Sequence, residues 1–103
     1  MWAQLITMRV KAGQEDSFPA MFKELDAAEP PDSGLIRSIA MQDQKDPTVA
    51  YILVVFESEE QARAREQAPA RHEALASMRA RMADVLDGPP SVVDLTVVRD
   101  TGA

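Results

Sequence analysis

The amino-acid sequence predicts an α+β protein with one four-stranded antiparallel sheet and helices on one face of that sheet. Segments of β-branched and aromatic residues alternate with stretches whose apolar residues recur at helical spacing. A short polar turn, residues 43–47, joins two strand segments, which should therefore pair antiparallel. The strand after this turn is apolar at nearly every position, so both faces of the sheet need a cover.

Length and composition limit the possible classes of protein. The chain has 103 residues, enough for one domain, which we expect over residues 1–100 with a short tail at 101–103. A net charge of −6 makes nucleic acid and anionic membranes poor partners. The absence of cysteine excludes disulfides, thiolate metal sites and cysteine nucleophiles. Because the sequence shows no signal peptide and no apolar run of about 20 residues, we expect a cytoplasmic protein.

The first half of the chain is expected to form a strand, a helix and a strand. Trp2–Val10 is the first strand. The helix that follows should run to about Ala28, with Pro19 in its first turn and Asp16 or Ser17 as its N-cap. Its buried face is predicted from residues at i, i+3, i+4 and i+7, namely Phe18, Met21, Phe22 and Leu25. Residues 29–34 read as a loop, and residues 35–42 as the second strand.

The third strand is the one that predicts a dimer. In Ala50–Phe56 both the odd and the even positions are apolar, so neither face can meet water. Two helices can cover one face of the sheet, and the sheet of a second copy is the simplest cover for the other.

The second half of the chain is expected to form a broken helix and a last strand. Ser58 and Gln61 have the spacing of a capping box at the start of the helix, and Pro69 interrupts it. An apolar stripe follows, formed by Leu75, Met78, Met82, Val85 and Leu86. The helix should end at residues 87–90, and Ser91–Arg99 should be the fourth strand. The resulting order, βαββαβ, is the ferredoxin-like one.

With these residues in place, the chain resembles the dimeric α/β-barrel superfamily, and most closely its antibiotic-biosynthesis-monooxygenase-like branch. The resemblance covers nearly the whole chain and is carried by Trp2–Val10 with Lys11–Gly13, by Tyr51–Ala62, and by His72. It implies two ferredoxin-like protomers whose sheets pack into a shared barrel, with a small-molecule cavity between sheet and helices. It also implies one of several activities, since the family includes cofactor-independent oxygenases of polycyclic phenols and haem-degrading enzymes.

Departures from the family pattern bear on the activity. The resemblance implies that haem degraders combine a histidine with an Asn on the first strand and a Trp on a helix, and that the phenol oxygenases also use an Asn and a Trp. This chain contains no Asn, and its only Trp, Trp2, begins the first strand. These absences argue against haem degradation and favour a non-catalytic binding protein.

Three residues are candidates for catalysis. His72 is the only histidine and the natural general base, although a histidine near a helix start more often caps or packs. Arg37 and Tyr51 lie on the two strands expected to pair, and either could stabilise a phenolate or enolate. The alternative is that Tyr51 fills the barrel and Arg37 pairs with an acid at the dimer interface.

Other side chains are assigned structural roles. The methionines expected on buried faces are Met8, Met21, Met41, Met78 and Met82. The helical arginines, interleaved with acidic residues, are expected on a solvated face; they are Arg63, Arg65, Arg71, Arg79 and Arg81. Since nucleotide-binding motifs and metal-ligand clusters are missing, we expect no cofactor and no metal.

The leading hypothesis is therefore a homodimer that binds a small apolar or aromatic molecule, and acts, if it is an enzyme, as a cofactor-independent monooxygenase on a phenol or quinol. In that scheme His72 takes the phenolic proton and Arg37 or Tyr51 stabilises the anion. The alternatives are a non-catalytic ligand-binding or interaction dimer, and an isomerase or lyase that works through His72 alone.

Overall fold

A computed structural model gives the structure of residues 1–29 and 33–102. Residues 30–32 of the expected loop and Ala103 of the expected tail lie outside the described residues. The elements are β1 (Trp2–Arg9), a 3₁₀ turn (Glu15–Ser17), α1 (Phe18–Ala27), β2 (Leu35–Gln42), β3 (Val49–Phe56), α2 (Glu59–Glu66), α3 (Pro69–Val85) and β4 (Ser91–Thr96).

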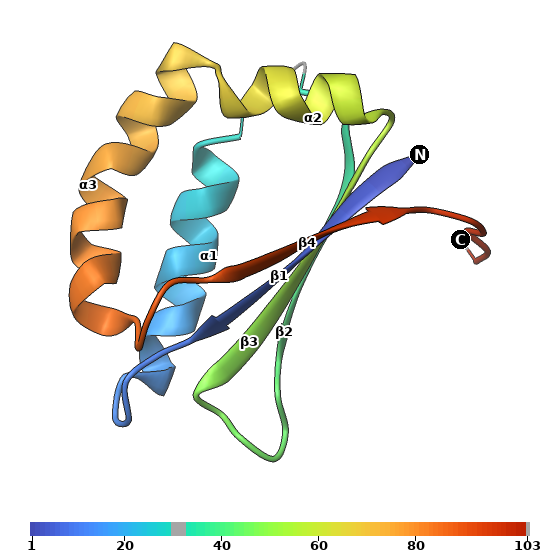
Figure 1. Ribbon diagram of the computed structural model, residues 1–103. Coiled ribbons are helices and arrows are strands. Elements are labelled where there is room, and N and C mark those ends of the chain that lie inside the picture. The colour runs from blue at the N-terminus through green and yellow to red at the C-terminus, as the bar shows by residue number, and fades with distance from the viewer. Residues whose placement is uncertain (30–32, 103) are drawn as a thin grey trace.

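The four strands form one antiparallel sheet in the order β2-β3-β1-β4. The three helices lie on one face of this sheet, as Figure 1 shows, while the opposite face carries no helix of the described chain. This is the ferredoxin-like arrangement that the sequence predicts. The fourth strand ends at Thr96, three residues earlier than expected, because Thr96 lies opposite Trp2, the first residue of β1. Beyond it, the Val97 N–H bonds to the carbonyl oxygen of Met1, which precedes β1.

The helix starts follow the local sequence. Ser58 is the N-cap of α2, and its Oγ accepts a hydrogen bond from the Gln61 N–H at 3.2 Å, as the capping box predicts. Ser17 is the N-cap of α1, but its hydroxyl donates to Gln14 Oε1 at 3.2 Å instead of accepting from the helix. Pro69 begins α3, and the two residues between the helices turn the chain as expected.

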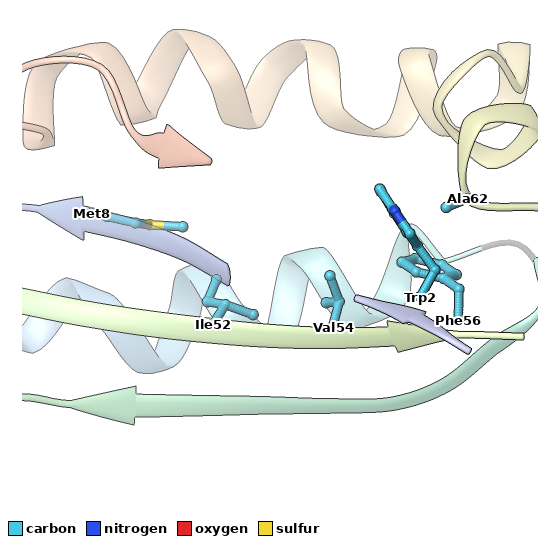
Figure 2. Close-up of a cluster of buried hydrophobic side chains, with 6 residues drawn as sticks. All are labelled: Trp2, Met8, Ile52, Val54, Phe56 and Ala62. Carbon is cyan, nitrogen blue, oxygen red and sulfur yellow. The ribbon is translucent and has the colours of Figure 1, made fainter. Parts of the chain in front are cut away.

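The core fills the space between the sheet and the helices. Alternate residues of β1 and β3 point toward the helices because side chains alternate along a strand. Figure 2 shows the main cluster, in which Trp2, Phe56 and Ala62 of α2 lie together. The centroids of the Trp2 and Phe56 rings are 6.3 Å apart. A second cluster, Val10, Phe18, Met21 and Ala50, packs α1 against the other end of the sheet.

The other face of the sheet is apolar and uncovered. The strand register places Ile39, Leu53, Leu5 and Val93 in one row across all four strands. Ile39 is 38% exposed and Val93 is 48% exposed in this single chain. Met41, expected to be buried, lies on this face at 41% exposure, because its parity on β2 points it away from the helices. We call this surface the open face.

Candidate ligand-binding site

A cavity lies between the sheet and helices α1 and α3. It consists of two adjoining regions of about 470 and 650 Å³, and four residues line both of them: Ile6, Leu25, Arg71 and Val92. Cavities of this size hold small organic molecules in other proteins. Ile6 and Val92 are direct neighbours on β1 and β4, whereas Leu25 comes from α1 and Arg71 from the first turn of α3. The lining of the smaller region includes residues of all four strands and of α2, so the cavity extends across the sheet beneath the helices.

The walls of the cavity are mostly apolar. The larger region is bounded by the apolar stripe of α3, including Leu75, Met78 and Met82, and by the Gly88–Pro90 segment that leads into β4. The smaller region continues over Ile52 and Val54 of β3. Such walls favour a ligand with a flat or branched hydrocarbon body.

A chain of polar contacts runs along β1 and β4 at the edge of the smaller region. Gln4 is 6% exposed, and its Nε2 donates to Asp94 Oδ1 at 2.9 Å. Asp94 Oδ2 accepts from Arg63 Nη2 at 2.9 Å, and the Arg63 guanidinium lies 5.0 Å above the Trp2 ring centroid. The hydrogen bond from Gln4, followed by the one from Arg63, holds the pKa of Asp94 below its ordinary value. Asp94 is therefore an ionised carboxylate at neutral pH.

An ion pair closes the end of the smaller region near α2. Arg65 Nε donates to the two carboxylate oxygens of Glu29, at 2.8 and 2.6 Å, and the two side chains are only 13% and 16% exposed. The Arg65 guanidinium also lies 5.1 Å above the Phe56 ring centroid. Both partners line the cavity. Each of the two charges is therefore largely neutralised by the other.

Arg71 differs from these paired groups. Its side chain is partly buried and lines both regions of the cavity. Burial lowers the pKa of Arg71, and the positive charge of Arg65 lowers it further. No hydrogen bond or ion pair joins its guanidinium to the described part of the chain. It is a cation at the cavity wall that forms no ion pair with a carboxylate of the described residues.

The three candidate catalytic residues are not brought together. His72 is exposed at the start of α3, where its Nε2 lies 2.5 Å from the Glu66 carbonyl oxygen, so it caps the end of α2. Arg37 and Tyr51 lie on paired strands as expected, but on the open face, opposite Val55 and Met41 respectively. Four residues along a strand separate these positions by about 13 Å. The Tyr51 hydroxyl donates to Asp43 Oδ2 at 3.4 Å. None of the three candidates lines the cavity between sheet and helices.

Three of the arginines assigned to a solvated face line the cavity: Arg65, Arg71 and Arg79. Arg79 is exposed as expected, but Arg65 and Arg71 are partly buried, so the expectation was wrong for these two. Arg71 precedes Leu75 and Met78 by four and seven residues, which is the spacing of one helix face. Arg65 follows the buried Ala62 by three residues. The periodicity of the apolar stripe on α3 therefore extends back to Arg71, and the spacing from Ala62 places Arg65 on the buried side of α2. Both positions were assigned to the solvated face because their side chains are charged.

Metal clusters and membrane-spanning helices are both missing from the described residues. Within residues 1–29 and 33–102, no group of three or more histidine, aspartate or glutamate side chains could hold a metal ion. Among the helices described, none is long and apolar enough to span a bilayer.

Comparison with known proteins gives the family. The sequence model of the antibiotic biosynthesis monooxygenase family matches residues 1–77. No curated protein matches the chain. Because the match covers well over half of its length, the chain belongs to the antibiotic biosynthesis monooxygenase family.

Solved structures agree with this assignment. A candidate antibiotic biosynthesis monooxygenase from Chloroflexus aurantiacus J-10-fl is 28% identical, with a TM-score of 0.69 over 99% of this chain and 98% of that one. A point mutant of MhuD, solved with two manganese protoporphyrin IX bound per active site, is 21% identical, with a TM-score of 0.81 over the full length of both chains. SnoaB from Streptomyces nogalater, a cofactor-independent oxygenase also solved as a point mutant, is 12% identical, with a TM-score of 0.76 over 96% and 94% of the two chains. At these identities the last two share the fold alone.

Proposed function

We propose that this protein is a homodimer that binds a small apolar or aromatic molecule in the cavity between the sheet and helices α1 and α3. The observation that carries the proposal is the cavity itself, whose two adjoining regions have largely apolar walls, with polar and charged groups concentrated in the smaller region. That combination is the usual form of a small-molecule site. Two distant structural relatives support the proposal, since SnoaB is a cofactor-independent oxygenase and MhuD was solved with a porphyrin in its active site.

The dimer would form through the open face. The row Ile39, Leu53, Leu5 and Val93 exposes apolar side chains across the whole width of the sheet, and helices of the described chain do not cover it. An identical row on a second copy would bury both rows face to face, at the ordinary spacing of packed sheets. Tyr51 and Arg37 would then belong to this interface, with Tyr51 filling it and Arg37 available for an acid of the partner.

The catalytic version of the proposal is cofactor-independent oxidation of a phenol or quinol. It needs a base beside the substrate. For His72 to take the phenolic proton, its imidazole would have to turn from the Glu66 carbonyl oxygen toward the cavity, a rotation open to an exposed side chain at a helix start. The non-catalytic version, a ligand-binding dimer, is favoured by the positions of His72, Arg37 and Tyr51 outside the cavity lining.

Binding and oxygen uptake, measured with a panel of quinols and polycyclic phenols, test both versions. We expect saturable binding of at least one compound, and we expect Val92→Trp, which fills the shared part of the cavity, to weaken it strongly. Ala80→Trp adds the same ring to the exposed side of α3 and should leave binding unchanged.

The outcomes separate the versions. Oxygen uptake that His72→Ala abolishes supports an oxygenase with His72 as base. Saturable binding without oxygen uptake supports the non-catalytic dimer. If no compound binds, or if Val92→Trp binds as well as the wild type, the cavity is not the ligand site.

A further inference from the structure

The arginines of α2 and α3 differ in whether a carboxylate forms an ion pair with the guanidinium group. Arg63 forms ion pairs with Glu59, Glu66 and Asp94, the closest at 2.9 Å. Arg65 is paired with Glu29 at 2.6 Å. Arg71 has no such partner among the described residues, although it is more buried than a solvated arginine would be.

The two carboxylates that act on the charge of Arg71 are already bound to other arginines. Glu29 and Glu66 both act on its charge, but Glu29 is held by Arg65 and Glu66 contacts Arg63 Nη1 at 3.5 Å. The like charges of Arg65 and Arg79 repel the Arg71 guanidinium and lower its pKa. Asp26 also lines the smaller region, but none of these three carboxylates forms an ion pair with Arg71. Arg71 is thus a cation in a largely apolar wall whose N–H donors no described carboxylate accepts.

An unpaired cation at an apolar surface is costly because burial removes water without supplying an acceptor. The planar guanidinium offers up to five N–H donors in a fork that matches two oxygens of an anion. An anionic ligand group would satisfy both the charge and the donors. Because Arg71 lines both regions, a ligand bound to it can place its hydrocarbon body in either one.

We propose that Arg71 anchors an anionic oxygen group of the ligand, so that the cavity selects amphiphilic acids, meaning apolar or aromatic molecules with a carboxylate, phenolate or similar anion at one end. This inference rests on the proposed function, since it assigns the ligand class of the same cavity. It adds a specificity-determining residue that lies outside the candidate set of His72, Arg37 and Tyr51.

Two fluorescent probes with one aromatic skeleton provide the test. 1-Anilinonaphthalene-8-sulfonate carries an anion, and N-phenyl-1-naphthylamine is the same molecule without the sulfonate. We expect Arg71→Gln to weaken binding of the sulfonate about tenfold, as for the loss of a charge-assisted hydrogen bond, and to leave the neutral probe unchanged. Arg71→Lys keeps the charge but loses the fork, and should fall between Arg71→Gln and the wild type. Lys23→Gln removes one positive charge from the exposed side of α1 and should change neither affinity.

The location of the probe must be established, because the open face is also apolar. Methyl NMR distinguishes the two places: shifts at Ile6 and Leu25 report the cavity, whereas shifts at Ile39 and Leu53 report the open face. Binding of the neutral probe by Arg71→Gln shows that this variant is folded around an intact cavity.

Each result decides a different claim. If the sulfonate shifts Ile6 and Leu25 but binds Arg71→Gln and the wild type equally, or if both probes weaken together, the anchoring role of Arg71 is overturned while the cavity stands. If neither probe shifts Ile6 or Leu25 in the wild type, the proposed ligand cavity itself fails.

Discussion

Arg65 and Glu29 form an ion pair that joins the last turn of α2 to the residue after the C-cap of α1, with Nε 2.8 and 2.6 Å from the two carboxylate oxygens. The two residues are 36 positions apart in the sequence. Because both side chains are largely shielded from water and one of them also covers the Phe56 ring, this pair is not an ordinary surface contact.

Removing the acid of this pair should destabilise the fold. We expect Glu29→Gln to lower the free energy of unfolding by about 2 kcal/mol, since it leaves the Arg65 charge shielded without its counter-charge. The measurement is urea denaturation followed by circular dichroism. Glu24→Gln breaks the exposed pair with Arg81 and should cost less than about 1 kcal/mol. Equal costs for the two variants would contradict a special role for the shielded pair.

Asp94 should contribute to the pH dependence of stability. Its pKa in the folded protein lies below the ordinary value of 3.8 because Gln4 and Arg63 donate hydrogen bonds to the carboxylate. A depressed folded pKa stabilises the protein above the unfolded pKa, and this contribution is lost as the pH falls through the folded pKa. The stability difference between wild type and Asp94→Asn should therefore be largest near neutral pH and shrink below about pH 4. A difference that stays constant from about pH 7 to about pH 3, measured by urea denaturation, would rule this out.

Gly34 should tolerate a side chain less well than Gly13. Both have positive φ, at +78° and +90°, where an L side chain is strained. A Cβ on Gly34 would also come within 2.7 Å of the Gln61 side chain, whereas a Cβ on Gly13 would meet nothing within 4 Å. We expect Gly34→Ala to lower the free energy of unfolding by about 1 kcal/mol more than Gly13→Ala, measured by thermal and urea unfolding. If the two variants lose the same stability, the contact with Gln61 is not restrictive.

Leu53→Glu should dissociate the proposed dimer. Leu53 lies near the centre of the open face, paired with Ile39 on one side and Leu5 on the other. In the dimer, a carboxylate at this position would be buried against apolar side chains or against the same carboxylate of the second copy, without a counter-charge. Light scattering coupled to gel filtration should show a dimer for the wild type and a monomer with native circular dichroism for the variant. Ala64→Glu, on the exposed side of α2, is the control and should remain dimeric. Wild-type protein that is monomeric at a concentration of tens of micromolar would contradict the proposed dimer.

Short-range patterns in the sequence predicted most of the fold. The strand and helix segments, the capping box at Ser58, the break at Pro69 and the antiparallel order all depend on residues close together in the chain. The doubly apolar strand β3 also predicted that helices would cover one face and leave the other bare, as Figure 1 shows. The limits of β4 were less accurate because its end depends on how far the neighbouring strand extends.

The positions of the candidate site residues could not be predicted from the sequence, because they depend on the face of the sheet to which each strand residue points. Strict alternation would place Arg37 on the same face as Leu35, which lines the cavity. A register shift between these two residues turns Arg37 to the open face instead. Tyr51 was ambiguous because β3 is apolar on both sides, so no pattern distinguished the cavity side from the open side.

The sequence by itself determined the element order, the helix caps and the two apolar faces of the sheet, because each follows from neighbours along the chain. Only the tertiary structure decided which charged groups meet. Glu29 neutralises the charge of Arg65 from 36 residues away, whereas Arg71 lines the cavity and forms no ion pair with a carboxylate of the described residues. Pairing of this kind depends on distances between elements, which local patterns do not encode.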